Sequence, residues 1–120
     1  MKTYQDLVAE ARTNIRLVLL DQADGAVAQA EILIDVREES EYAASHLPGA
    51  VHMSRGVLEG RIASVPAGKK ADSKILLYCR TDARASLAAV SLQGMGYTDV
   101  QVLAGGFDAW IGAGKPVYGN

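Results

Sequence analysis

Residues 74–90, KILLYCRTDARASLAAV, contain a strand, a loop and the start of a helix in direct succession. The run at residues 75–79 is apolar without alternation, which is typical of a short strand that is buried on both faces. After a polar turn, small and apolar residues predict a helix over residues 84–93, just before Gly94 and Gly96, because glycine often ends helices. A buried strand that passes through a short loop into a helix is the repeating unit of a parallel sheet.

The rest of the chain repeats this alternation of short apolar runs and helical segments. Near the start, apolar residues recur at spacings of three and four from Tyr4 to Ile15 and predict an amphipathic helix. The expected strands lie at residues 16–20, 32–36, 50–53, 74–79 and 99–103. The other expected helices lie at residues 25–31, 39–45, 57–65 and 84–93. This pattern predicts an α/β fold with a central parallel sheet of about five strands and helices on both faces.

Size and composition fit one globular domain over residues 1–120. Hydrophobic residues make up 49% and charged residues 22%, which excludes a mainly disordered chain. The net charge of −2 gives no overall positive field, so neither nucleic acid nor a membrane surface is an expected partner. The apolar runs are too short to cross a bilayer, and the first residues, MKTYQDLVAEAR, become charged before a signal peptide's apolar core can develop. We therefore expect a cytoplasmic location.

Cys79 is the single cysteine of the chain, which excludes an intrachain disulfide and a four-cysteine zinc site. It ends an expected strand, and chemistry in parallel sheets is expected where strands end and helices begin. Loop amide groups, the helix terminus and the guanidinium groups of Arg80 and Arg84 together favour an anion, so the Cys79 thiol should ionise easily. The alternative is a small buried packing residue. Two arginines within five positions of the thiol favour an anionic nucleophile or an anionic substrate.

Three motifs in the chain occur together in one known family. ILIDVR at residues 32–37 is followed by HLPGA at residues 46–50, and LAGGF at residues 103–107 is followed by Trp110 and GKPV. Between them lies the six-residue loop CRTDAR, residues 79–84. In their order and separation these motifs resemble those of the rhodanese-like sulfurtransferases. The resemblance covers residues 16–117 and implies a rhodanese-like three-layer core there, preceded by a helical extension over residues 1–15.

The resemblance also implies a reaction and the residues that perform it. Cys79 is implied to be the catalytic nucleophile, which takes sulfur from a donor such as thiosulfate or polysulfide, becomes a persulfide, and passes the sulfur to cyanide or a thiol. The substrate-binding residues that the loop implies are Arg80, Thr81, Asp82, Ala83 and Arg84. Asp35 and Arg37 are expected to support the site from the end of their strand. The expected partners are a small sulfur-containing anion as donor and a thiophilic acceptor; the sequence names no protein partner.

No cofactor is implied, and no metal site is expected. His46 and His52, with one cysteine and no clear third ligand, are too few to bind a metal ion. His46, in the HLPGA turn, is interpreted as a structural hydrogen-bonding residue. The acidic residues at positions 38, 39 and 41 are interpreted as the solvated start of a helix, stabilised by the helix dipole.

Two loop positions depart from the family's commonest pattern. Glycine is frequent where Asp82 stands, and serine or threonine is frequent where Ala85 stands, with Ser86 one position late. The Asp82 carboxylate is expected to raise the pKa of Cys79 and to weaken binding of an anionic donor, modestly so if it pairs with Arg80 or accepts loop N–H groups. The departures therefore bear on the preferred donor rather than on the reaction class.

Two alternative functions stay open. Cysteine phosphatases and arsenate reductases of the cell-cycle-phosphatase type have a similar loop, but five residues separate their cysteine and arginine, whereas four separate Cys79 and Arg84. The shorter loop forms a narrower ring of amide groups, which suits a sulfur atom better than a phosphoryl group. The other alternative is a non-catalytic sulfur-binding or interaction module that kept the fold and lost turnover.

Overall fold

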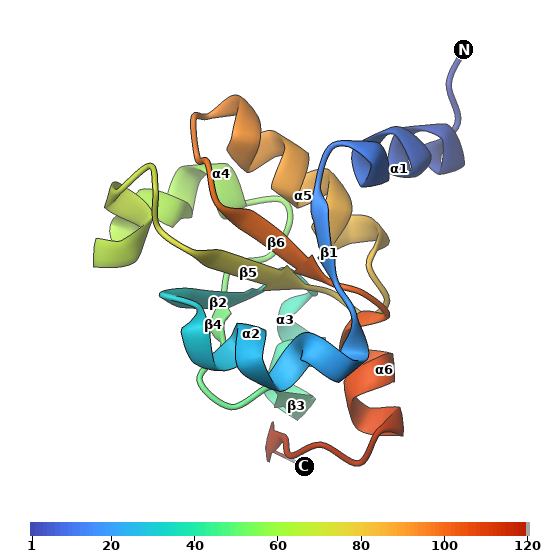
Figure 1. Cartoon of the computed structure of the whole chain (residues 1–120), viewed down its shortest axis with the longest axis vertical. Helices are drawn as coiled ribbons and strands as arrows, with labels where there is room; N and C mark the ends of the chain where they lie inside the picture. The colour runs from blue at the N-terminus through green and yellow to red at the C-terminus, as the bar shows by residue number, and fades with distance from the viewer. Residues whose placement is uncertain (120) are drawn as a thin grey trace.

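The structure is a computed structural model that describes residues 1–119, and its centre is a five-stranded parallel sheet (Figure 1). Every neighbouring pair of strands is parallel, and the register pairs Leu33 with Leu76 and Leu77 with Val102. From one edge to the other the strands are β1 (Arg16–Val18), β6 (Val100–Leu103), β5 (Ile75–Tyr78), β2 (Ile32–Asp35) and β4 (Val51–His52). The predicted α/β fold with a parallel sheet of five strands is confirmed.

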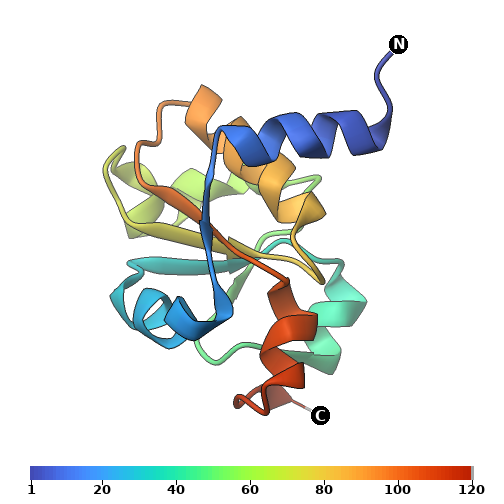
Figure 2. The same cartoon turned by 45° about the vertical axis from the view of Figure 1, so that its right-hand side comes forward.

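Helices cover both faces of this sheet, as Figure 2 shows. The helices on the two faces are α4 (Leu58–Arg61) and α5 (Ala83–Gly94) on one, and α2 (Ala23–Gln29), α3 (Glu39–Ala44) and α6 (Gly106–Gly112) on the other. Alternate strand residues serve the two layers: Ile34 and Leu77 pack with α5, whereas Leu33 and Leu76 pack with α2 and α6. Every residue of β2, β5 and β6 is buried, and apart from Asp35 and Gln101 these strands carry apolar or aromatic side chains on both faces.

The opening helix, α1 (Tyr4–Thr13), packs on the outside of α5 (Figures 1 and 2). It begins with a capping box, in which the Thr3 hydroxyl accepts a hydrogen bond from the N–H of Asp6 and the Asp6 carboxylate accepts one from the N–H of Thr3. Val8 and Ala11 are buried on its inner face. The cap at Thr3 and the buried side chains of Val8 and Ala11 therefore hold α1 in place on α5.

Several short elements differ from the sequence-based expectations. The expected helix 57–65 is α4 followed by a 3₁₀-helix, Ile62–Ser64; the backbone is then extended at Val65, because a residue before proline disfavours helical backbone. Further 3₁₀-helices lie at Leu20–Gln22 and Pro66–Lys69. The antiparallel pair β3 (Ser45–His46) and β7 (Tyr118–Gly119) was not expected. Within residues 1–119, none of the helices has the length and apolar character needed to cross a membrane.

Candidate active site

Cys79 lies at the carboxyl end of β5, where residues 79–82 lead into α5. Only 1% of its surface is exposed. The N–H of Ala85, in the first turn of α5, points at the sulfur with an N–Sγ distance of 3.4 Å. The N–H groups of Thr81 and Arg84 also favour the thiolate. The strand end, the loop and the helix start therefore surround the sulfur with amide groups, which is an arrangement that binds anions.

The Cys79 thiol is harder to ionise than its neighbours alone would imply. Burial raises the pKa of the thiol above its ordinary value, because the enclosed thiolate loses its hydration. The N–H of Ala85 and the positive charge of Arg84 lower the pKa without offsetting the burial. The expectation of easy ionisation is therefore wrong for the enclosed thiol. The reason is that the protein covers the sulfur almost completely, so that the thiolate would lose its hydration.

Arg84 forms an ion pair with Glu41 of α3. The Nη1–Oε1 distance is 3.0 Å and the Nη2–Oε2 distance is 3.4 Å, and both side chains are partly buried. The hydrogen bond from Arg84 lowers the pKa of the Glu41 carboxyl, although burial acts in the opposite direction. Glu41 also accepts the N–H of Glu38 and so caps α3. The interpretation of Glu41 as merely solvated is therefore wrong, because α3 packs close enough to α5 for it to neutralise the loop arginine.

Arg80, Thr81 and Ala83 lie toward the outside of the loop. Arg80 is exposed, and its Nε lies 3.3 Å from an oxygen of Asp108. Thr81 is exposed and Ala83 is half-buried. The loop thus directs the N–H groups of Thr81 and Arg84 to the sulfur, while the side chain of Arg80 points to α6.

Asp82 pairs with a residue far away in the sequence. Its Oδ1 accepts hydrogen bonds from Nε of Arg12, at 3.0 Å, and from Nη2 of Arg12, and its Oδ2 accepts the N–H of Gly105 at 3.2 Å. Of the two arrangements considered for Asp82, pairing with Arg80 is not found, because Arg12 of α1 is the ion-pair partner; the carboxylate does accept an N–H group, but from Gly105 in the turn before α6. No motif in the sequence connects Arg12 with the loop.

The start of α6 closes over the back of the loop. The N–H of Phe107 donates a hydrogen bond to the carbonyl of Cys79 at 2.9 Å. Gly106 has φ +54°, and a Cβ at this position would collide with the carbonyl oxygens of Thr81 and Cys79. Gly106 of LAGGF therefore lets the backbone of α6 touch the backbone of the loop.

Asp35 and Arg37 form a buried ion pair beside Tyr78, the residue before Cys79. The Nη2–Oδ2 distance is 2.8 Å, and the Tyr78 hydroxyl donates to the same carboxylate oxygen at 2.8 Å. Arg37 also lies over the Phe107 ring, 4.1 Å from its centroid. These contacts connect Asp35 and Arg37 to Cys79 through Tyr78 and Phe107, and none of the bonds of the pair goes to the sulfur itself.

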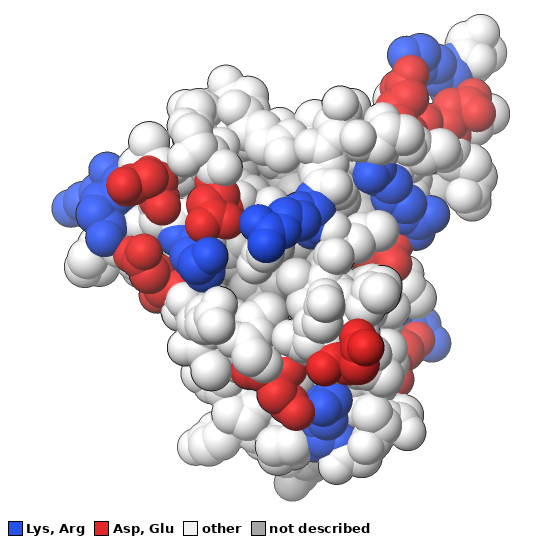
Figure 3. Space-filling model, in the orientation of Figure 1, with Lys and Arg blue, Asp and Glu red and all other residues white. Residues whose placement is uncertain are grey.

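The two histidines bind backbone carbonyl groups. His46 Nδ1 lies 2.9 Å from the Tyr42 carbonyl oxygen, and His52 Nε2 lies 2.8 Å from the Arg37 carbonyl oxygen. Across residues 1–119, histidine, cysteine and acidic side chains nowhere gather as a set of three that suits a metal ion. Acidic and basic side chains are intermixed on the face seen in Figure 3, and neither sign covers it.

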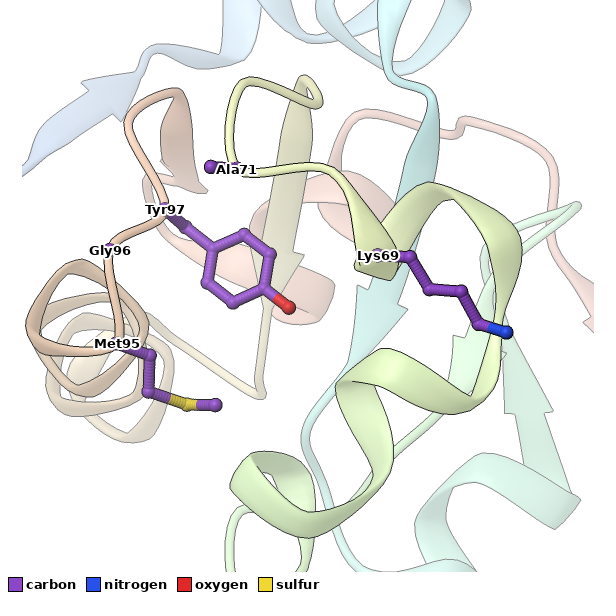
Figure 4. A pocket seen from close by; sticks show the side chains of 5 residues that line it. All are labelled: Lys69, Ala71, Met95, Gly96 and Tyr97. Atoms are coloured by element: carbon purple, nitrogen blue, oxygen red, sulfur yellow. The ribbon is translucent and has the colours of Figure 1, made fainter.

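Two surface pockets lie outside the loop. One, of about 200 Å³, is lined by Lys69, Met95 and Tyr97 at the opposite end of the strands, and Figure 4 shows the Tyr97 ring between the other two side chains. The Tyr97 hydroxyl donates a hydrogen bond to the Gly68 carbonyl, so its polar atom is already used. The other is a groove of about 620 Å³ between α1 and α5. Neither pocket includes Cys79, so the candidate site remains the loop of residues 79–84.

The chain is similar in sequence to known proteins. The profile of the Rhodanese-like domain matches residues 18–113. The thiosulfate sulfurtransferase GlpE of Pseudomonas savastanoi pv. phaseolicola is 29% identical over 98 residues, which are 82% of this chain and 89% of that protein.

Two solved structures resemble most of the chain. One is a protein of unknown function from Rhodopseudomonas palustris, described as a possible tyrosine phosphatase; its TM-score is 0.85 at 26% identity, covering 98% of this chain and 96% of that one. The other is the 30 kDa polysulfide-sulfur transferase homodimer of Wolinella succinogenes, with a TM-score of 0.77 at 28% identity, covering 94% of this chain and 85% of that one.

Proposed function

Because this chain belongs to the family of rhodanese-like domains, we propose that it is a sulfurtransferase in which Cys79 carries the transferred sulfur. One observation supports this most directly: the amide groups of the loop and of the first turn of α5 surround the Cys79 sulfur. Fixed N–H donors around one atom stabilise negative charge that develops there, as an oxyanion hole does. The terminal sulfur of a persulfide carries such a charge.

The proposed reaction has two displacements at sulfur. The Cys79 thiolate attacks the outer sulfur of thiosulfate, a new S–S bond forms, and the old S–S bond breaks so that sulfite leaves with its electron pair. An acceptor, cyanide or a thiolate, then attacks the outer sulfur of the Cys79 persulfide, and the Cys79 thiolate is released. Electrons balance in both steps, because each is a displacement in which one bond to the moving sulfur replaces another.

In this proposal the donor binds to the loop of residues 80–84. Asp35 and Arg37 support that loop through their contacts with Tyr78 and Phe107. A thiosulfate or polysulfide anion suits the amide groups and the guanidinium of Arg84. The names of the Pseudomonas and Wolinella relatives support these two donors. Because Arg84 is paired with Glu41, the donor must share or displace that contact. We further propose that residues 16–117 are the rhodanese core, that residues 1–15 extend it, and that the protein works in the cytoplasm, where thiol acceptors are kept reduced.

A phosphatase function is the second candidate, because the Rhodopseudomonas structure is described as a possible tyrosine phosphatase. Only four residues separate Cys79 and Arg84, and a ring of this size favours one sulfur atom over a phosphoryl group with three oxygens. We therefore propose sulfur transfer ahead of phosphate hydrolysis.

Intact-protein mass spectrometry tests the proposal. After mixing with thiosulfate or polysulfide, the protein should gain one sulfur atom, and cyanide or a thiol should remove it. Cys79→Ser keeps the size and loses the only thiol, so it should gain nothing and transfer nothing. Transfer by that variant near the wild-type rate would contradict the mechanism. Hydrolysis of p-nitrophenyl phosphate without sulfur uptake would favour the phosphatase, and persulfide formation without turnover would favour a sulfur-binding module.

A further inference from the structure

Asp82 stands at the N-cap of α5 without capping it. An aspartate at this position ordinarily accepts the N–H of the second or third helical residue. In α5, which begins at Ala83, these are the N–H groups of Arg84 and Ala85. The Asp82 side chain makes neither bond, although its backbone lies at the helix start with φ −153° and ψ 0°. The two amide groups that it leaves free are the ones that favour the Cys79 thiolate.

The carboxylate is instead bound on the other side by two groups. Arg12 of α1 donates to Oδ1 through both Nε and Nη2, and the N–H of Gly105 donates to Oδ2 at 3.2 Å. The Asp82 side chain is only 16% exposed, whereas that of Arg12 is 44% exposed. Water therefore competes little for the carboxylate, and losing Arg12 leaves it with a single protein partner among the described residues.

Arg12 is itself firmly placed. α1 is capped at Thr3 and buries Val8 and Ala11, and the side chain of Gln93 in α5 donates to the carbonyl of Asn14 at 2.9 Å. The residues that anchor α1 on α5 are thus separate from the residue that reaches the loop. A substitution at Arg12 can alter the loop while the helix stays in place.

We propose that Arg12 is a positioning residue of the active site: it holds the Asp82 carboxylate away from the N–H groups of Arg84 and Ala85 and so keeps them free for the sulfur of Cys79 and its donor. This rests on the proposed sulfur transfer at Cys79. A released carboxylate turns to the helix start, because a charged N-cap residue gains two strong donors and a favourable dipole there. It then occupies the amide groups that the thiolate, the persulfide and an anionic donor require.

The test is a double-mutant cycle between Arg12→Gln and Asp82→Ala. Two quantities are measured: the pKa of Cys79, from the pH dependence of alkylation by iodoacetamide, and KM and kcat with thiosulfate as donor and cyanide as acceptor. Arg12→Gln should raise the Cys79 pKa and raise KM about threefold to fivefold, while kcat changes less. In the Asp82→Ala background the same substitution should change neither quantity, because no carboxylate is left to hold.

Two further variants separate positioning from charge and from folding. Arg16→Gln removes an exposed arginine of β1 that pairs with no carboxylate among residues 1–119, so it should leave both quantities unchanged. Arg12→Lys keeps one cationic donor for Asp82, so its Cys79 pKa and its KM should lie between those of the wild type and those of Arg12→Gln. The midpoint temperature of thermal unfolding should fall only slightly in Arg12→Gln, because the released Asp82 carboxylate then caps α5.

An equal effect of Arg12→Gln with and without the Asp82 carboxylate overturns the proposal, as does an effect of Arg16→Gln of the same size. A large loss of thermal stability with an unchanged Cys79 pKa would reduce Arg12 to a structural contact and overturns it too. The alkylation arm needs no sulfur chemistry. A wild-type protein that takes up no sulfur would therefore contradict the proposed function while the cycle still decides the role of Arg12.

Discussion

The guanidinium of Arg84 and the carboxylate of Glu41 face each other edge to edge, with Nη1–Oε1 at 3.0 Å and Nη2–Oε2 at 3.4 Å. Arg84 is therefore already paired before any donor arrives. An anionic donor competes with Glu41 for the same fork of N–H groups, so the strength of this pair sets part of the donor's apparent affinity.

Glu41→Gln should release Arg84 toward the site. Gln keeps an oxygen for the N–H of Glu38 and so preserves the cap of α3, but it removes the charge that neutralises Arg84. We expect a lower pKa of Cys79 and a KM for thiosulfate that falls about twofold to fivefold, with a smaller gain as salt is added. Glu39→Gln, in the same turn, is the matched control. A raised KM would mean that Glu41 orients Arg84 productively.

Arg84→Lys should lower the rate with an oxyanion donor. Lysine keeps the charge but loses the planar fork that binds Glu41 at two points and that suits thiosulfate. A loss of about tenfold in kcat/KM is expected from about 1.4 kcal/mol of transition-state stabilisation. Arg80→Lys, at an exposed position, should cost much less. If lysine replaces Arg84 without loss, the residue acts only as a diffuse charge.

The Glu41–Arg84 pair should stabilise the fold in a pH-dependent way. The pKa of Glu41 is lowered in the folded protein from its ordinary value of 4.5, first by the hydrogen bond from Arg84. Its contribution is therefore fully present above that ordinary value and is lost as the pH falls through the lower folded-state pKa. Urea unfolding should find wild type more stable than Glu41→Gln at about pH 7, with the difference shrinking toward about pH 3. A difference that is independent of pH would contradict this.

Tyr78→Phe should destabilise the protein, because it removes a buried hydroxyl that has two hydrogen-bond partners. The Tyr78 hydroxyl donates to Asp35 at 2.8 Å and accepts the N–H of Leu47 at 3.1 Å, and both partners are buried. Burial and the negative charge of Asp35 raise the Tyr78 pKa, so the group stays a neutral donor. We expect a loss of about 1–3 kcal/mol in the free energy of unfolding. Tyr4→Phe, at an exposed position, should cost almost nothing.

Ser86→Ala should stabilise the protein. The Ser86 hydroxyl is buried in α5 and has no hydrogen-bond partner among residues 1–119. Alanine removes an unpaired polar group and is the better helix former, so a gain of about 0.5–1 kcal/mol is expected by urea unfolding. Ser91→Ala in the same helix should instead lose stability, because the Ser91 hydroxyl donates to Glu59 at 2.6 Å. A loss of stability on Ser86→Ala would contradict the interpretation of the Ser86 hydroxyl as an unpaired buried group.

The parallel sheet was predictable because its signal is local. Residues 75–78 and 32–34 form runs without alternating polar positions, and each run is followed by a polar turn and a helix, so burial and direction follow from the pattern itself. The position of Cys79 and its loop was predictable too, because the loop directly joins a predicted strand to a predicted helix in the sequence. The short pair β3 and β7 was missed because two-residue strands have no periodicity to read.

The electrostatic partners of the loop were not predictable in the same way. Asp82 has Arg80 as its near neighbour in sequence, yet it pairs with Arg12, because helix packing decides which side chains meet. Glu41 reads as a helix-start residue, and only the position of α3 beside α5 makes it the partner of Arg84. The pKa of Cys79 was misjudged for a related reason: the sequence names the groups that favour a thiolate, whereas only the structure gives the burial that opposes them.

The pairing of β1 with β6 sets an order for folding during synthesis. Residues 16–18 lie beside residues 101–103, so β1 has to wait for β6, the strand of the sheet that comes latest in the sequence, before it gains its neighbour. Helix α1 and Arg12 wait somewhat less long, because their partners α5 and Asp82 are made shortly before β6. Until residues 82–103 have been made, the nascent chain therefore exposes the apolar side chains of α1 and β1, which is a state open to chaperones and to aggregation. The active-site loop acquires its final geometry only after Gly105 and Phe107 have been made, because both donate hydrogen bonds to it.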